Sequence, residues 1–299
     1  RTISPHRFEV ASSAYTTVRI APHLPAIGAG RRWYAQKMND AAFGPAIATS
    51  GLSKTYGSVH ALAYLSLTGE CGAIYGFLGP NGAGKTTTIR LLMGFIRPSH
   101  GTARMFGHDT WADGVRARAR AGYLVQSDAL FPELTGAEQL AFAQTLSGHG
   151  APLRDRLLDL LELSRADLNR KLKTYSKGMR QKLALIAASQ HDPELLILDE
   201  PTAALGVKEA GVVLRYIAQA RARGIAVIFI THNVHHAYPI ADRFTILNRG
   251  TSYGTFLKRD VTREQVVEMM AGGQELTELE HELEEFSRAD TVAAERRSS

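Results

Sequence analysis

Apolar residues recur in short runs from about residue 46 onward, and the spacing within each run predicts the element it forms. Alternating apolar and polar positions at 47–52 and 59–67, separated by a turn, predict two antiparallel strands. The runs 244–247 and 253–256, joined by another turn, predict a hairpin. Continuous apolar runs predict further strands, buried on both faces, at 73–78, 121–125, 195–198 and 225–230.

Segments with helical spacing lie between these predicted strands. The predicted helices are 86–95, 153–163, 177–189 and 207–222. A further helix is predicted to begin at a capping box formed by Thr135-Gly136-Ala137-Glu138. Alternating strands and helices indicate parallel strand pairing. The sequence therefore predicts an α/β fold with a mostly parallel sheet core, an N-terminal antiparallel β-subdomain and a helical insertion at about 133–190.

Composition divides the chain into three parts. Residues 1–45 are rich in Pro, Ala, Arg and Ser without a sustained period, which predicts a flexible N-terminal extension. We place the functional domain at 46–272 and expect 1–37 to lie outside it. Residues 273–299 predict an acidic helical tail, in which apolar positions are spaced three and then four apart: Leu276, Leu279, Leu283 and Phe286. Such a helix would pack on its own domain or, alternatively, bind a partner.

The overall composition is that of a globular protein, with 44% apolar residues and a net charge of +6. Cys71 is the one cysteine, which excludes an internal disulfide and favours a reducing compartment. No apolar run approaches the roughly 18 residues that span a bilayer, so we expect a membrane role only through a partner. The mild basic excess requires no nucleic acid, and we expect none as a partner.

A complete phosphate-binding motif lies between the predicted strand 73–78 and the predicted helix 86–95. It consists of Gly79, Pro80, Asn81, Gly82, Ala83, Gly84, Lys85 and Thr86, followed by Thr87. The glycines would let backbone N–H groups point into one concavity at a helix N-terminus, which is a ready site for a polyphosphate. Lys85 would reach the β- and γ-phosphates and Thr86 would bind Mg²⁺. The alternative is a glycine-rich turn that binds nothing.

An acidic pair, Asp199 and Glu200, follows the predicted strand 195–198 directly. Parallel sheets bind ligands at the carboxyl ends of their strands, so this pair would face the phosphate loop. We expect Asp199 to bind Mg²⁺ and Glu200 to act on a water molecule; the alternative is an acidic helix cap. The next predicted strand, 225–230, ends at the same edge, next to His232. His235 and His236 follow it, and a zinc site formed by these three histidines is the less favoured interpretation.

These motifs together resemble the ATPase subunit of an ABC transporter, over residues 46 to about 285. Asp199 and Glu200 match its Walker B motif, and the phosphate loop matches its Walker A motif. Tyr56 matches the adenine-stacking aromatic, Gln126 the Q-loop and His232 the switch histidine. The run Tyr175-Ser176-Lys177-Gly178-Met179 matches the signature. The order and approximate spacing of these motifs are those of the family.

The resemblance implies a dimer of two such chains, identical or different, in which each ATP is completed by the partner's signature residues Ser176, Lys177 and Gly178. Glu200 would be the general base or orient the water, and His232 and Gln126 would contact the γ-phosphate, the water or Mg²⁺. The implied metal ligands are Thr86, Gln126 and Asp199. The implied place is the cytoplasmic face of the cell membrane, where permease subunits would dock near Gln126 and the helical insertion.

Three features depart from the family pattern. Lys177 stands where the signature often has Gly, as in drug, antibiotic and polysaccharide exporters. Gly206 stands where the loop after Walker B usually has Asp, and residues 203–285 resemble monosaccharide importers instead. Two alternatives to a transporter ATPase therefore stay open: a nucleotide-gated dimerising module with weak hydrolysis, and a soluble ABC protein acting on ribosomes or DNA.

Overall fold

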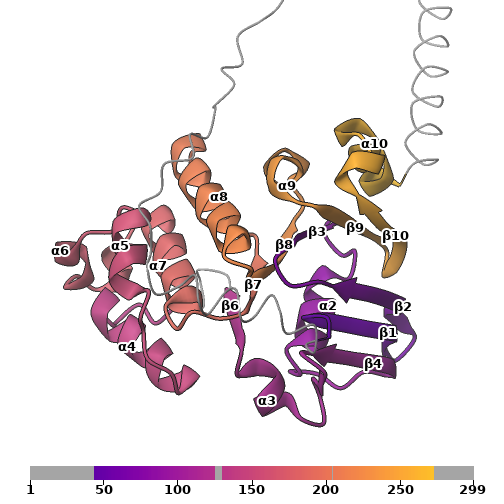
Figure 1. Ribbon diagram of the computed structural model, residues 1–299, viewed down its shortest axis with the longest axis horizontal. Helices are drawn as coiled ribbons and strands as arrows, with labels where there is room; N and C mark the ends of the chain where they lie inside the picture. The colour runs from indigo at the N-terminus through magenta and orange to yellow at the C-terminus, as the bar shows by residue number, and fades with distance from the viewer. Residues whose placement is uncertain (1–43, 125–129, 204, 273–299) are drawn as a thin grey trace, which may run out of the picture. The chain divides into compact units, whose positions relative to one another are not determined.

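A computed structural model describes residues 44–124, 130–203 and 205–272 (Figure 1), all of which fall in one compact unit of the chain. Three sequence predictions lie outside the described residues. They are the extension 1–45, apart from its last two residues, the acidic tail 273–299 and the Q-loop residue Gln126.

One mixed sheet of ten strands organises the described residues, in the order β5-β4-β1-β2-β10-β9-β3-β8-β7-β6. The strands are β1 (Ile47–Tyr56), β2 (Val59–Gly69), β3 (Ile74–Leu78), β4 (His100–Met105), β5 (His108–Asp109), β6 (Ala121–Leu124), β7 (Leu195–Asp199), β8 (Ala226–Thr231), β9 (Arg243–Asn248) and β10 (Thr251–Leu257). Strands β9, β3, β8, β7 and β6 pair in parallel. Strands β1, β2, β4 and β5 form the antiparallel part, of which the sequence predicts the pair β1 and β2.

Helices cover both faces of this sheet (Figure 1). They are α2 (Lys85–Leu92), α3 (Gly114–Arg118), α4 (Gly136–Ser147), α5 (Arg154–Leu160), α6 (Arg165–Leu168), α7 (Lys177–Ser189), α8 (Val207–Ala222), α9 (Val234–Ile240) and α10 (Arg263–Ala271), with short 3-10 turns at Leu172–Thr174 and Lys258–Asp260. Two hydrophobic cores result, one containing α7 to α10 and the other α2. Successive residues of β7 pack into the two cores in turn: Leu196 lies in the core with α7 to α10, and Ile197 lies in the core with α2. This confirms that the strand is buried on both faces.

The predicted helical insertion is formed by α4 to α7. Its capping box is present as predicted, since Thr135 Oγ1 accepts the Glu138 N–H and Glu138 Oε2 accepts the Thr135 N–H. Helix α7 has the predicted bounds, whereas α5 is shorter than the predicted helix 153–163. Glu162 has a φ of +54°, a left-handed conformation that no helix can continue through.

Two other boundaries differ from the sequence prediction. Helix α2 ends at Leu92 rather than at residue 95, because Gly94 has a φ of +62° and reverses the chain. The predicted strand 47–52 continues to Tyr56 in β1, because Lys54, Thr55 and Tyr56 also pair with β2. Strands β4 and β5 and helices α3, α6, α9 and α10 were not predicted individually from the sequence.

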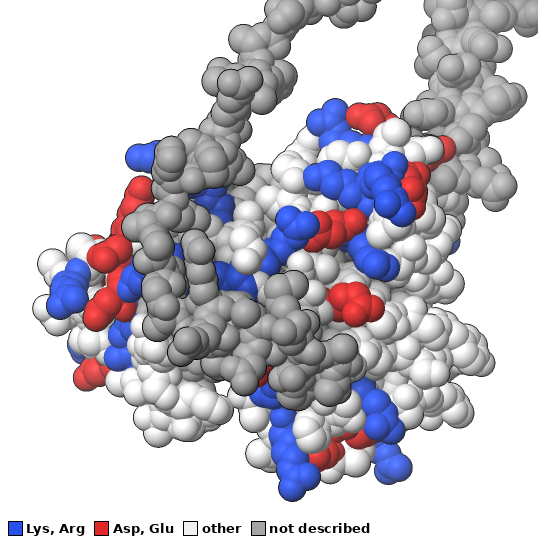
Figure 2. Space-filling model, in the orientation of Figure 1, with Lys and Arg blue, Asp and Glu red and all other residues white. Residues whose placement is uncertain are grey.

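Surface charge on the face shown in Figure 2 is mixed, with Lys and Arg lying among Asp and Glu. Ion pairs also occur among the described residues, for example between Glu133 and both Lys171 and Lys173. Among the helices of residues 44–124, 130–203 and 205–272, none is long and apolar enough to cross a bilayer.

Candidate functional site

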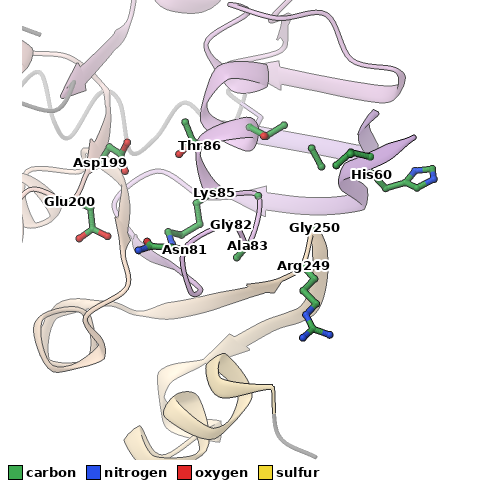
Figure 3. Close-up of a pocket in the computed structure, with 14 residues that line it drawn as sticks. His60, Asn81, Gly82, Ala83, Lys85, Thr86, Asp199, Glu200, Arg249 and Gly250 are labelled. Carbon is green, nitrogen blue, oxygen red and sulfur yellow. The ribbon is translucent and has the colours of Figure 1, made fainter. Parts of the chain in front are cut away.

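A cavity of about 470 Å³ opens between the loop after β3, the end of β7 and the turn between β9 and β10 (Figure 3). Its lining is Val59, His60, Ala61, Asn81, Gly82, Ala83, Gly84, Lys85, Thr86, Thr87, Asp199, Glu200, Arg249 and Gly250. Asp199 and Glu200 stand on one side of it, facing the loop residues Asn81, Lys85 and Thr86 on the other (Figure 3). The structure therefore brings together the two motifs that the sequence predicted to face each other.

Glycine is required in the loop by its close approach to the strands around it. Gly84 has a φ of +99°, and a Cβ there would lie 2.7 Å from the Ala61 carbonyl oxygen. The β9–β10 turn fastens the loop, because the Gly250 N–H donates to the Ala83 oxygen at 3.1 Å while the Gly250 oxygen accepts from the Ala63 N–H at 2.7 Å. These contacts fix the loop against β2.

Lys85 is buried at the start of α2, and its ammonium points into the loop. Its Nζ donates to the carbonyl oxygens of Gly79 at 2.6 Å and Pro80 at 2.9 Å. Burial lowers the pKa of Lys85, an effect that the nearby carboxylates of Glu200 and Asp199 oppose. No acidic side chain lies in the first turn of α2, so the positive end of the helix is free to favour an anion.

Asp199 ends β7 and is only 8% exposed. Burial raises its pKa to about 6, the neighbouring Glu200 carboxylate adds to the rise, and Lys85 opposes it. A cation bound beside Asp199 would supply the positive charge that this buried carboxylate lacks. The Asp199 carboxylate and the Thr86 hydroxyl are both hard oxygen donors, of the kind that suits Mg²⁺.

Glu200 is held by groups from the end of β8. Its Oε2 accepts the Thr231 hydroxyl at 2.8 Å, and its Oε1 accepts the His232 N–H at 2.9 Å. His232 Nδ1 also lies 2.6 Å from Glu200 Oε1. The resemblance implies a general base at Glu200 and a contact of His232 with the γ-phosphate, the water or Mg²⁺; the structure places the two side chains next to each other. Sequence analysis did not predict Thr231, although this residue directly precedes His232 at a strand end.

Other predicted residues lie apart from the cavity lining. Tyr56 is half-exposed at the end of β1, where it pairs with the lining residue Val59, and Lys54 Nζ lies 4.9 Å from the centre of its ring. The signature residues are at the start of α7, where Ser176 caps the helix by accepting the Met179 N–H at 3.1 Å. Ser176 and Lys177 are exposed there. This chain alone does not bring its signature to its own phosphate loop.

Three histidines near the site do not form a metal centre. His232 contacts Glu200, while His236 Nδ1 lies 2.8 Å from the Thr202 hydroxyl. Within the described parts of the chain, no three His, Cys, Asp or Glu side chains are grouped to hold a metal ion.

A family model, related sequences and a solved structure all match this chain, and they belong to one protein family. A family model described as ABC transporter matches residues 62–203. The daunorubicin/doxorubicin resistance ATP-binding protein of Streptomyces peucetius is 39% identical over 69% of this chain and 63% of its own length. The bacitracin transport ATP-binding protein of Bacillus licheniformis is 35% identical over 68% of this chain and 67% of its own length.

An importer and a solved structure are also similar. The arabinose import ATP-binding protein of Azospirillum brasilense is 34% identical over 77% of this chain but only 46% of its own length. The structure of an ATP binding subunit of an ABC transporter superposes with a TM-score of 0.67 and 27% identity, covering 74% of this chain and 93% of the other. The chain thus spans between about half and two thirds of the length of these curated relatives. From its fold, its loop and these similarities, the chain belongs to the family of ABC transporter ATP-binding proteins.

Proposed function

We propose that this chain binds and hydrolyses ATP and thereby energises the movement of a solute across a membrane by separate permease subunits. The observation that carries the proposal is the cavity in which the 79–87 loop faces Asp199 and Glu200. The relatives named above concern drug resistance, bacitracin transport and arabinose import. A drug, antibiotic, polysaccharide or sugar is therefore the class of solute to test first.

The residues of the cavity suit a magnesium nucleotide. The 79–87 loop would hold the phosphates, and Lys85 would exchange the carbonyl oxygens of Gly79 and Pro80 for phosphate oxygens. Thr86 and Asp199 would hold Mg²⁺, with Gln126 as a further ligand. When bound, Mg²⁺ would neutralise charge on the transferred phosphoryl group.

Glu200 would take a proton from the attacking water or orient it, because it lines the cavity opposite the loop that would hold the phosphates. The Thr231 hydroxyl and the His232 N–H hold that carboxylate in place. The His232 ring would exchange its Glu200 contact for the γ-phosphate. Tyr56, next to the lining residue Val59, would stack on the adenine.

A second copy, or a related chain, would complete each site. The signature residues Ser176, Lys177 and Gly178 do not line this chain's own cavity, yet Ser176 opens a helix of 13 residues at the surface. A helix N-terminus with an exposed hydroxyl favours an anion. We therefore propose a head-to-tail dimer in which this end of α7 meets the γ-phosphate held by the partner.

The permease would dock on an exposed apolar cluster of the helical insertion, at the cytoplasmic face of the membrane. Phe131 and Phe142 pack edge to face, with ring centres 5.4 Å apart, and both are exposed. Leu146, one turn further along α4, is 71% exposed. Exposed aromatic and aliphatic side chains that lie together favour a protein partner.

Phosphate release by the purified chain, measured with MgATP and with ATP in excess EDTA, tests the proposal. We expect metal-dependent turnover that falls by about 100-fold or more in Glu200→Gln, which removes a general base but keeps the shape of the side chain. ATP binding by the variant, measured by calorimetry, should persist. Co-purification with a membrane-embedded partner separates a transporter subunit from a soluble ABC protein.

A second candidate is a nucleotide-gated dimerising module with weak hydrolysis, and Gly206 favours it. This residue caps α8 without a side-chain hydrogen bond, in the position where the family usually has Asp. Equal low turnover in the natural chain and in Glu200→Gln would support this module and contradict the ATPase.

A further inference from the structure

Gln181 is a buried amide on the helix that the signature residues open. It lies in α7, is 4% exposed, and donates its Nε2 proton to the main-chain oxygen of Glu200 at 3.2 Å. A buried amide that lost its partner would be costly, so this contact holds both groups in place. Neither the phosphate loop nor the signature includes Gln181, and its side chain does not line the cavity.

The backbone that Gln181 contacts is strained. Glu200 has a φ of +47°, which a side chain with a Cβ adopts only at a cost. Its N–H donates to the Ile230 oxygen at 2.9 Å, and its oxygen accepts the Ala203 N–H at 3.0 Å in addition to the Gln181 amide. Hydrogen bonds on both sides of the residue thus maintain a conformation that the chain would otherwise leave.

A second contact links the same two elements. A Cβ on Gly178 would lie 3.3 Å from Cδ2 of Leu205, so the loop after Glu200 packs against the first turn of α7. Within the described residues, the Gln181 amide is the hydrogen-bonded link from α7 to Glu200. The helix that presents Ser176 to a partner is therefore fastened to the carboxylate-bearing residue of its own chain.

We infer that Gln181 is a positioning residue for Glu200, and that it couples the signature helix to the general base of the same chain. The inference rests on the proposed function. A displacement of α7, as its N-terminus engages a nucleotide held by the partner, moves the Gln181 amide and with it the Glu200 carbonyl. Because Thr231 and His232 hold the carboxylate separately, loss of the amide leaves the side chain present but its backbone less well fixed.

Two substitutions test this role: Gln181→Met, which matches the side chain in size, and Gln181→Glu, which keeps it polar. Met has no donor, and Glu has none when it is ionised, so the pH dependence of kcat in Gln181→Glu also shows whether a restored donor restores turnover. Gln190 provides the matched control, since it is also buried at the other end of α7 and also donates to a main-chain oxygen, that of Leu140, at 2.9 Å. Gln190 Oε1 also accepts from Arg154 Nε at 2.7 Å, so Gln190→Met removes at least as much buried hydrogen bonding as Gln181→Met does, at a site far from Glu200.

We expect kcat for phosphate release to fall about tenfold in both Gln181 variants, with KM and the ATP affinity within about twofold of the natural chain. Gln190→Met should lower the melting temperature at least as much as Gln181→Met does, because it removes two hydrogen bonds, and should leave kcat within about twofold. Gln181 variants that fold and retain full kcat would overturn the inference, as would an equal fall in kcat for Gln190→Met.

A double-mutant cycle tests the coupling. If a displacement of α7 caused by nucleotide binding at Ser176 reaches Glu200 through Gln181, the two substitutions act on one step. The combination of Ser176→Ala with Gln181→Met should then lower kcat by much less than the product of the two single effects. Multiplicative effects would contradict coupling. Turnover by the natural chain that depends on Glu200, measured in the same assay, shows separately that the proposed function holds, so its failure is distinguishable from failure of the Gln181 inference.

Discussion

Glu200 is the residue at which the described contacts of the site converge. Its carboxylate is held by Thr231 and His232, its backbone by Ile230 and Gln181, and its left-handed conformation depends on both sets. A side chain that must act on a water molecule benefits from such fixation, because catalytic groups lose rate steeply when they are displaced. Removing a single atom that holds Glu200 should therefore change the rate of turnover.

Removing the Thr231 hydroxyl tests that fixation. Thr231→Val should lower kcat about three- to tenfold, because Glu200 Oε2 loses a donor, whereas Thr231→Ser should retain most of the activity. Thr245→Val is the control, since Thr245 is equally buried, in β9 on the other side of β3, but pairs with the Thr255 hydroxyl at 2.9 Å. A loss of turnover in the Thr245 variant equal to that in the Thr231 variant would argue against a specific role.

The pKa of Asp199 predicts a pH dependence of stability. Because its folded-state pKa of about 6 lies above the ordinary 3.8, the folded protein holds a proton there that the unfolded chain releases. The penalty for ionising Asp199 therefore develops as pH rises from about 4 to 6 and is complete above about 6. Asp199→Asn removes it, and should stabilise the nucleotide-free protein on the order of 1–2 kcal/mol at pH 7.5, after allowance for solvent screening.

Thermal unfolding of the two proteins at pH 7.5 and pH 4.5 checks this sign. The advantage of the variant should shrink at the lower pH, where Asp199 is protonated in the folded state. A variant that is less stable at pH 7.5, or whose advantage grows on acidification, would contradict the assignment of a buried, charge-deficient carboxylate.

At the scale of elements, the phosphate loop depends on the β-strands that surround it. Gly84→Ala would place a Cβ 2.7 Å from the Ala61 oxygen in a left-handed conformation. Gly148→Ala is the control, because Gly148 also has a positive φ, +69°, but a Cβ there would lie in open space. The control should cost about 1 kcal/mol of unfolding free energy from backbone strain alone, and Gly84→Ala about 2 kcal/mol more from the contact.

Chemical denaturation of both variants, together with ATP binding, measures the difference. Gly84→Ala should also weaken ATP binding, because the loop and α2 would shift together. Equal destabilisation of the two variants, with ATP binding intact in both, would show that the loop is not packed as described.

The strand and helix pattern was largely predictable, because periods of two and of about 3.6 residues are written in consecutive positions. Strand β4 was missed because only Ala103 and Met105 of its residues are buried, and α10 because only Val266 and Met270 are. Helix α5 ends at a left-handed Glu162, which no composition rule signals. Boundaries thus depended on backbone conformations set by tertiary packing.

The site divides in the same way. The phosphate loop and the pair Asp199 and Glu200 were predictable, since each motif is contiguous in the chain. The bonds that Glu200 makes with Thr231 and Gln181 join residues 31 and 19 positions away, so no local spacing reveals them. The placement of Tyr56 beside the cavity lining, rather than in it, also depended on how β1 meets β2.

At the scale of the whole molecule, the described chain carries a nucleotide cavity and a signature helix that do not meet within one copy. Ser176 at the start of α7 is exposed, and Glu200 is tied to the same helix through Gln181. Two copies arranged head to tail would supply each cavity with the missing helix end. ATP would then bind to both copies at once, and its hydrolysis would let the two copies separate.

Sedimentation velocity of the Glu200→Gln variant, with and without MgATP, tests this central claim most directly, because the variant should bind nucleotide without consuming it. We predict a monomer alone and with MgADP, and a dimer with MgATP that the additional substitution Ser176→Arg abolishes by blocking the helix end. A variant that binds MgATP but stays monomeric at every concentration, or a dimer that forms equally with Ser176→Arg, would contradict the account.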